Sequence, residues 1–448
     1  MSAKQKQRLD VVNPYACGID IGSRSHFVAI GQGKEDVYEF GVYTEDHRQL
    51  ITFLTTHQIK TIAMESTGNY WQTLFTSLQV AGFDVILVCG NQTKNVKGRK
   101  TDVQDCQWIQ KLHSLGLLSN SFLPSEFVAQ LRIYSRQRQK YIRVQSRLIN
   151  QMQRDLRLMN IRLEIALRDI TGKSGMAIIE AILKGERDAK QLASLVDYRV
   201  KKSHEEIAKS LEGNWDEGYL FVLSQHYREY AANLLLVQEC EVAIEQILKE
   251  KMTTNEIDVS EFKGHLKAKK KNKNTPSIDF QKYSYQYFGG IDLFAIEGIN
   301  QNTVLTLISE VGNDIDKFPT AKSFASWLHL SPNQKVSGGR VLSNKTKRGA
   351  NPLSQALKSS ANVIGNMKSG FLNNFFKRIN YKKGRKEAIA STARKLAVII
   401  WNMLRNYQPY KPQNTEVVEE KVRIKKIKEI RKLISKYEIQ KNELVLFN

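Results

Sequence analysis

Four acidic residues lie where the pattern of the chain predicts that strands or helices begin or end. Asp20 and Glu65 each close an apolar run before a glycine turn, whereas Asp102 and Asp105 open a predicted helix. The i, i+3 spacing of the last two places both on one helical face. Four converging carboxylates repel one another and are tolerated only around cations. Such oxygen ligands suit Mg²⁺ or Mn²⁺, and two ions about 3.5–4 Å apart serve phosphoryl-transfer chemistry.

Each acid also has a structural explanation, which the sequence leaves open. An isolated Asp-x-Gly favours a turn-capping role for Asp20. Thr101 or Asp102 can cap the predicted helix, and carboxylates in its first turn favour the positive helix N-terminus. The combination of four acids, rather than any one of them, favours a metal site.

A second candidate for chemistry is Ser337, which precedes two glycines that permit positive φ and leave the hydroxyl exposed. By itself a Ser-Gly-Gly is typical of an ordinary loop. Ser331 precedes a proline and is more typical of a cap, and Ser343 lacks the glycine context. A serine hydroxyl is a poor nucleophile until a base or a metal takes its proton. The neighbouring cations suited to a phosphate and its developing charge are Arg340, Lys345, Lys347 and Arg348.

The order GIDIG, MESTG and KTDVQD resembles the RuvC/RNase H-like domain of the DEDD-type insertion-sequence transposases. These are insertion-sequence family one-hundred-and-ten and its relatives, which include the Piv invertase. The resemblance spans residues 14–168 and 288–405, where the second stretch resembles the C-terminal transposase domain. It implies a catalytic, metal-binding tetrad and a nucleophilic serine, which by position are Asp20, Glu65, Asp102, Asp105 and Ser337.

The resemblance implies a recombinase that moves its own insertion sequence between DNA sites. The serine would attack the scissile phosphate to give a phosphoserine and a free 3′-hydroxyl, with Mg²⁺ (or Mn²⁺) at the acids. Relatives take a non-coding bridge RNA and pair the acidic site of one protomer with the serine of another, which implies a homodimer or homotetramer. Two alternatives stay open: a RuvC-like junction nuclease that hydrolyses with water, and a non-catalytic nucleic-acid scaffold.

The elements that must position the acids form a predicted α/β domain over residues 1–118. Hairpin strands followed by strands that alternate with helices predict a mixed sheet covered by helices. Together with the resemblance, this predicts a RuvC/RNase H-like fold. We expect strands at 15–21, 26–31, 37–42, 59–65 and 83–89, and helices at 46–57, from 69 onward and at 101–115.

Residues 125–167 contain no glycine or proline and predict one long amphipathic, coiled-coil-like helix. Its other faces are rich in arginine, and acids are almost absent before Asp155. We therefore interpret it as a phosphate-binding and dimerising helix rather than a purely structural one. The nucleic-acid contacts predicted on it are Arg136, Arg143, Arg147 and Arg154.

The region 119–287 continues as a helical insertion to which the sequence assigns no chemistry. Glu239, Glu241 and Glu245 are predicted to be solvated. Between residues 263 and 273 there are six lysines and no acid, which predicts a basic linker able to lie along a nucleic-acid backbone. Its predicted contacts are Lys269, Lys270 and Lys271.

A mostly helical C-terminal domain is predicted over 288–410, followed by a basic helical tail over 411–448. Residues 295–312 resemble a helix–hairpin–helix, but Glu297 and Asn300 replace the usual proline and second glycine. Phosphate contact and a structural hairpin are therefore equally favoured. Arg394 and Lys395, in the helix after a basic turn, are predicted nucleic-acid contacts. For the tail, nucleic acid is favoured over a partner helix or a membrane surface.

Composition bounds these interpretations. At 448 residues two or three domains are expected, and the formal net charge of +23 favours a polyanionic partner such as nucleic acid. No apolar run approaches the ~20 residues of a membrane span, and no secretory signal is evident. The four scattered cysteines are typical of small core residues in a reducing compartment. We expect a cytoplasmic, nucleoid-associated protein of a bacterium or archaeon.

Overall fold

The computed structural model divides into two compact units, Met1–Leu123 and Pro124–Asn448. The finer domain borders expected at 118, 287 and 410 stay predictions. The structure describes residues 10–93, 101–253, 274–332, 334–343, 346, 349, 351–412 and 415–437.

The first unit is built on a five-stranded mixed sheet with strand order β3-β2-β1-β4-β5. β2 runs antiparallel to both β1 and β3, whereas β4 runs parallel to both β1 and β5. This order is that of an RNase H-like sheet, so the predicted RuvC/RNase H-like fold is confirmed. The strands are β1 (Ala16–Ile21), β2 (His26–Ala29), β3 (Val37–Phe40), β4 (Thr61–Glu65) and β5 (Asp84–Val88).

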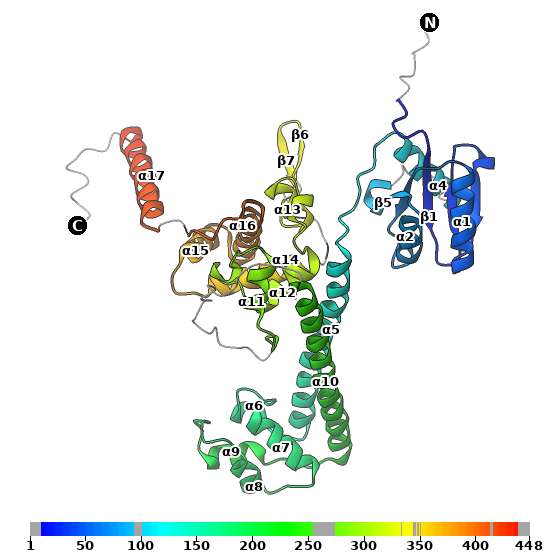
Figure 1. Cartoon of the computed structure of the whole chain (residues 1–448). Helices are drawn as coiled ribbons and strands as arrows, with labels where there is room; N and C mark the ends of the chain where they lie inside the picture. The colour runs from blue at the N-terminus through cyan, green and yellow to red at the C-terminus, as the bar shows by residue number, and fades with distance from the viewer. Residues whose placement is uncertain are drawn as a thin grey trace. The chain divides into compact units, whose positions relative to one another are not determined.

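Side chains that alternate along β1 point into two different layers. Ile19 belongs to a buried apolar cluster with Leu50 of α1 and Leu74 of α2. Gly18 faces the opposite layer, where α4 packs on β1, β2 and β4 (Figure 1). The helices of this unit are α1 (Thr44–Thr56), α2 (Trp71–Val80), α3 (Gly90–Thr93), α4 (Asp102–Ser114) and the 3₁₀ helix η1 (Lys34–Asp36).

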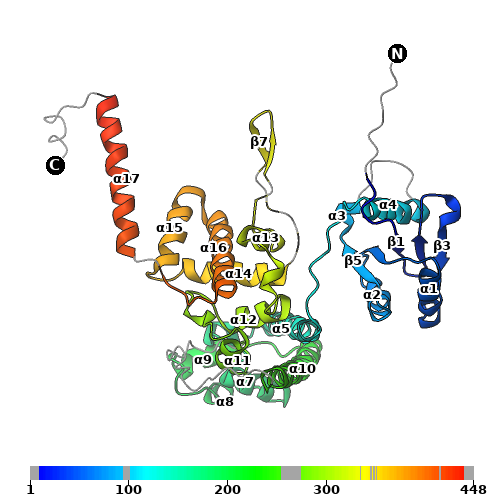
Figure 2. The ribbon, with the colours of Figure 1, turned by 45° about the horizontal axis from the view of Figure 1, so that its top comes forward.

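Two long helices, α5 (Glu126–Leu158) and α10 (Glu217–Thr253), lie side by side in the second unit (Figures 1 and 2). Leu148 and Met152 of α5 share a buried cluster with Leu223 and Tyr230 of α10. The apolar stripe that predicted a coiled coil is therefore covered, at least here, by another helix of the same chain.

The predicted long helix is wrong at its C-terminal end, because α5 stops at Leu158 rather than near residue 167. Asn160 adopts a left-handed backbone with φ of 59°, which turns the chain and which asparagine tolerates better than most residues. The insertion then continues, as predicted, in short helices: α6 (Leu163–Ala166), α7 (Lys173–Leu183), α8 (Ala189–Ser194) and α9 (His204–Leu211).

In the remainder of the second unit, the regular elements of the described residues are helices and one hairpin of β6 (Lys335–Ser337) and β7 (Arg340–Ser343), which projects beyond α13 in both views (Figures 1 and 2). The α-helices are α11 (Phe280–Tyr287), α12 (Gln301–Glu310), α13 (Ala321–Trp327), α14 (Pro352–Gly365), α15 (Phe371–Lys383), α16 (Arg385–Asn406) and α17 (Thr415–Lys436). Two 3₁₀ helices, η2 (Leu293–Ala295) and η3 (Ile315–Lys317), connect them.

Among the described helices, none combines the length and the apolar character that a bilayer span requires. All four cysteines are free, and Cys17 and Cys106 are buried, as expected of small core residues.

Candidate active site and nucleic-acid surface

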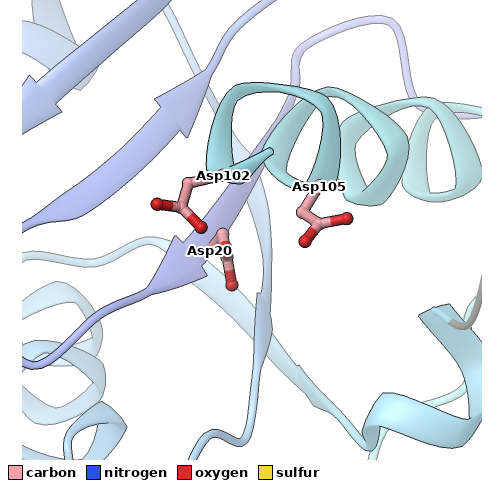
Figure 3. Close-up of side chains that lie close together, drawn as sticks. All are labelled: Asp20, Asp102 and Asp105. Atoms are coloured by element: carbon pink, nitrogen blue, oxygen red, sulfur yellow. The ribbon is translucent and has the colours of Figure 1, made fainter. Parts of the chain in front are cut away.

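Asp20, Asp102 and Asp105 lie together at the end of β1. Each offers a carboxylate oxygen, and these oxygens lie within 4.8 Å of one another. Figure 3 shows the side chain of Asp20 next to the first turn of α4, which carries the other two. Asp102 is exposed and the other two aspartates are half-buried, so the cluster is open to solvent. Three of the four predicted acids thus lie close together, although Asp20 is more than 80 positions from the other two in the sequence.

The start of α4 is fixed by Thr101, whose side chain accepts a hydrogen bond from the backbone N–H of Gln104 at 3.3 Å. Of the two capping residues that the sequence left open, the structure therefore uses Thr101. Asp102 and Asp105 follow in the first turn, where the helix dipole favours negative charge. This stabilisation partly offsets the repulsion among neighbouring carboxylates.

The body of α4 is held tightly against the sheet. A side-chain carbon added at Gly18 would lie 2.2 Å from the backbone nitrogen of Gln110 and 2.5 Å from the carbonyl oxygen of Cys106. The Gln110 amide also donates to the carbonyl oxygen of Ala16 at 3.2 Å. Glycine at position 18 is therefore what lets α4 approach β1 closely enough to bring its aspartates beside Asp20.

Glu65 lies on the neighbouring strand but outside this group of three. Ile19 pairs with Met64, so Asp20 and Glu65 are the next residues along two parallel strands. The Glu65 carboxylate accepts a hydrogen bond of 2.5 Å from the Thr93 hydroxyl. Its role as a fourth ligand stays a prediction.

The chemistry of the donor set fits a hard divalent cation, because three carboxylates present only oxygen. Ligand oxygens on one Mg²⁺ lie about 4 Å apart or less, so modest side-chain rotation would bring these oxygens onto a shared ion. Cys106 lies close by, but burial raises the pKa of its thiol to about 12 and keeps it protonated. Asp20, Asp102 and Asp105 are thus the residues that would hold the ion.

Ser337 is exposed at the end of β6, directly before the Gly338–Gly339 turn of the hairpin. Both glycines adopt positive φ, 53° and 75°, as expected from the sequence. Ser337 pairs with Arg340 across the two strands, and directly opposite residues share one face of a hairpin. Arg340 is exposed as well, and its role as a phosphate contact beside Ser337 stays a prediction. Lys345, Lys347 and Arg348 lie outside the described residues.

The arginine-rich face of α5 is partly neutralised by acids of α10 and α12 and by one acid of α5 itself. Three of the four predicted nucleic-acid contacts are ion-paired: Arg136 with Glu310 at 2.8 Å, Arg147 with Glu229 at 3.4 Å and Arg154 with Asp155 at 3.3 Å. Arg143 is exposed. The nucleic-acid role of these arginines stays a prediction, as does that of Lys269, Lys270 and Lys271, which lie outside the described part of the chain.

The expectation that Glu241 is solvated is wrong. Its carboxylate accepts a 2.8 Å hydrogen bond from Nε of Arg138, whose side chain is 2% exposed. Arg138 also donates to the side chain of Asn302, and Glu241 accepts from Ser277. No local pattern marks this pair, because its members are about 100 residues apart on α5 and α10.

The helix–hairpin–helix turn is used for packing. Gly298 adopts φ of 78°, and a side-chain carbon there would lie 2.9 Å from the carbonyl oxygen of Ser360. The Glu297 carboxylate accepts the backbone N–H groups of Phe371 and Leu372 at the start of α15. Of the two readings that the sequence left open, these contacts favour the structural hairpin.

Two protein-family models match the chain. A family described as Transposase, of the DEDD IS110 type, matches residues 17–161, and one described as Transposase IS116/IS110/IS902 family matches residues 292–375. No curated protein matches the chain. An RNase H-like sheet with clustered carboxylates, within a transposase match, defines an enzyme of DNA transposition. More particularly, the chain belongs to the IS110 family of transposases.

Proposed function

We propose that this transposase cuts and rejoins DNA through a covalent link between Ser337 and the DNA, with a divalent ion held by the aspartate cluster. The observation that carries the proposal is the convergence of Asp20, Asp102 and Asp105 within 4.8 Å in a domain of a DEDD transposase family. The exposure of Ser337 at a Gly-Gly hairpin beside Arg340 supports the nucleophile assignment.

In the proposed step the Ser337 oxygen forms a bond to the scissile phosphorus, and the bond from phosphorus to the 3′ oxygen breaks. The serine proton passes to water, and the leaving oxygen is protonated to a free 3′-hydroxyl. Arg340 would stabilise the charge that develops on the phosphate. A bound Mg²⁺ or Mn²⁺ would polarise the phosphate and position it. The phosphoserine retains the ester bond energy, so strand exchange needs no ATP.

We further propose that DNA sites are chosen with a bridge RNA and that the active enzyme is a homodimer or homotetramer. Both follow from the resemblance to relatives. The formal net charge of +23 supports binding of nucleic acid, because an excess of cations attracts a polyanion. As a DNA recombinase the protein would act in the cytoplasm, at the nucleoid.

The test uses a plasmid that carries the element with its flanking DNA, incubated with the full chain and Mg²⁺ and analysed on denaturing gels. We expect a protein–DNA adduct for the natural chain and for Ser343→Ala, a matched change on the same hairpin, and none for Ser337→Ala, which should still bind DNA. Asp102→Asn should also abolish cleavage. Cleavage by Ser337→Ala without an adduct would instead indicate a RuvC-like nuclease that uses water.

A further inference from the structure

Residues 317–386 contain fifteen lysines and arginines and no acidic residue. This acid-free stretch includes the Ser337 hairpin and the whole of α15. On a surface with both acidic and basic residues, acids would neutralise many of these cations, as they do for the arginines of α5. Such an excess of one sign indicates a polyanionic partner for this part of the second unit.

Nine residues beyond this stretch, Lys395 of α16 packs against α15 in an unusual position. Its ammonium lies 5.2 Å from the ring centre of Phe371 and 5.2 Å from that of Phe375, both on α15. The guanidinium of Arg378 lies 5.5 Å from the same Phe375 ring. Burial, and then the charge of Arg378, lower the pKa of the half-buried Lys395. No carboxylate contributes to the pKa shift of Lys395, and neither Lys395 nor Arg378 forms an ion pair among the described residues.

Two adjacent cations without a counter-charge are costly when one of them is partly desolvated, unless an anion joins them. The aromatic rings hold the ammonium in place through cation–π contacts, which leaves its outer side for a ligand. Phe371, Phe375, Arg378 and Lys382 follow one another at steps of four, three and four residues, so they share one face of α15. Lys382 therefore extends the row of cations by roughly 6 Å. Figure 2 shows α15 and α16 packed side by side.

We propose that Arg378, Lys382 and Lys395, the cationic seam of α15 and α16, bind successive phosphates of the substrate DNA. The inference rests on the proposed function and adds which residues of the second unit bind the DNA duplex. DNA is favoured over RNA because the same acid-free stretch carries the serine that would attack a DNA phosphate. Contacts to phosphates carry no sequence information, so the seam would anchor DNA without reading its sequence.

The test measures binding of the full chain to a fluorescent DNA duplex by anisotropy over a range of salt concentrations. Lys395→Gln and Arg378→Gln should each lower the slope of log K against log salt by about one, and weaken binding severalfold. Lys395→Arg should restore both. Lys377→Gln is the matched control, because it removes the same charge from α15 while Lys377 donates to the carbonyl oxygen of Lys368.

Slopes for Lys395→Gln and Arg378→Gln that equal the slope for Lys377→Gln would overturn the proposal. So would a loss seen with an RNA hairpin and not with duplex DNA. Lys395→Met, which keeps the aliphatic stem over the rings, should unfold at the temperature of the natural chain while losing the same phosphate contact. The readout is binding, so normal DNA binding by the seam variants refutes the seam alone, whereas adduct-free cleavage by Ser337→Ala refutes the serine mechanism alone.

Discussion

Replacing Gly18 with alanine tests whether the approach of α4 to β1 builds the proposed metal site. The added carbon would lie 2.2 Å from the Gln110 nitrogen, which is about 1 Å short of ordinary contact. The obstructing atoms belong to the backbone, so no side-chain rotation relieves the clash and the helix must move. Overpacking of this kind costs about 1–3 kcal/mol of unfolding free energy. The movement would separate Asp102 and Asp105 from Asp20.

Metal ligands tolerate shifts of only about 0.2 Å, so the affinity for Mn²⁺ should fall at least about tenfold. Calorimetric titration of the folded full chain with Mn²⁺, combined with thermal unfolding, measures both effects. Gly218→Ala is the control, because a carbon there would meet only the side chain of Asp216, at 3.1 Å. If Gly18→Ala binds Mn²⁺ with the affinity of the natural chain and unfolds at the same temperature, the reasoning is refuted.

Further predictions concern buried charges. Glu241→Gln should destabilise the chain by about 3–5 kcal/mol in urea unfolding, because it leaves the buried Arg138 without its counter-charge. The double variant Arg138→Met with Glu241→Leu should recover most of this loss. Unchanged stability of the single variant would contradict the buried ion pair. Burial, and then the neighbouring His47, lower the pKa of His26 from 6.5 to about 4. The unfolded state therefore binds more protons between these values, so stability is full above pH 6.5 and falls by up to about 3 kcal/mol as the pH drops to 4. His26→Phe should remove this component of the pH dependence, and an equal dependence in both proteins would exclude it.

The sequence predicted the fold of the first unit well, because its signals are local. Apolar runs that end in Asp20 and Glu65 mark strand ends, and Thr101 marks a helix start. Neighbouring strands of a sheet bring the acids at their ends to one region. The cluster was therefore predictable in outline. The hydrogen bond between Glu65 and Thr93 was not, because it depends on how α3 packs.

In the second unit, the features that the sequence did not reveal depend on contacts between distant residues. The arginine-rich face of α5 predicts a phosphate-binding helix, which stays a prediction, but it did not reveal that Arg136 pairs with Glu310, 174 positions further along the chain. Periodicity did not reveal the end of α5 either, since it rests on a single left-handed residue, Asn160. The contact of Lys395 with two aromatic rings likewise could not be predicted, because it depends on the packing of α15 on α16.

The most direct test of the account identifies the residue that carries the DNA. The adduct formed with Mg²⁺ would be digested with protease and nuclease, and its nucleotide-linked peptide sequenced by mass spectrometry. We predict that the nucleotide is attached to Ser337, and that no such peptide forms in the Asp102→Asn protein. A nucleotide on another residue, or complete cleavage that leaves only free DNA ends, would contradict the proposed pairing of an aspartate-bound ion with a serine nucleophile.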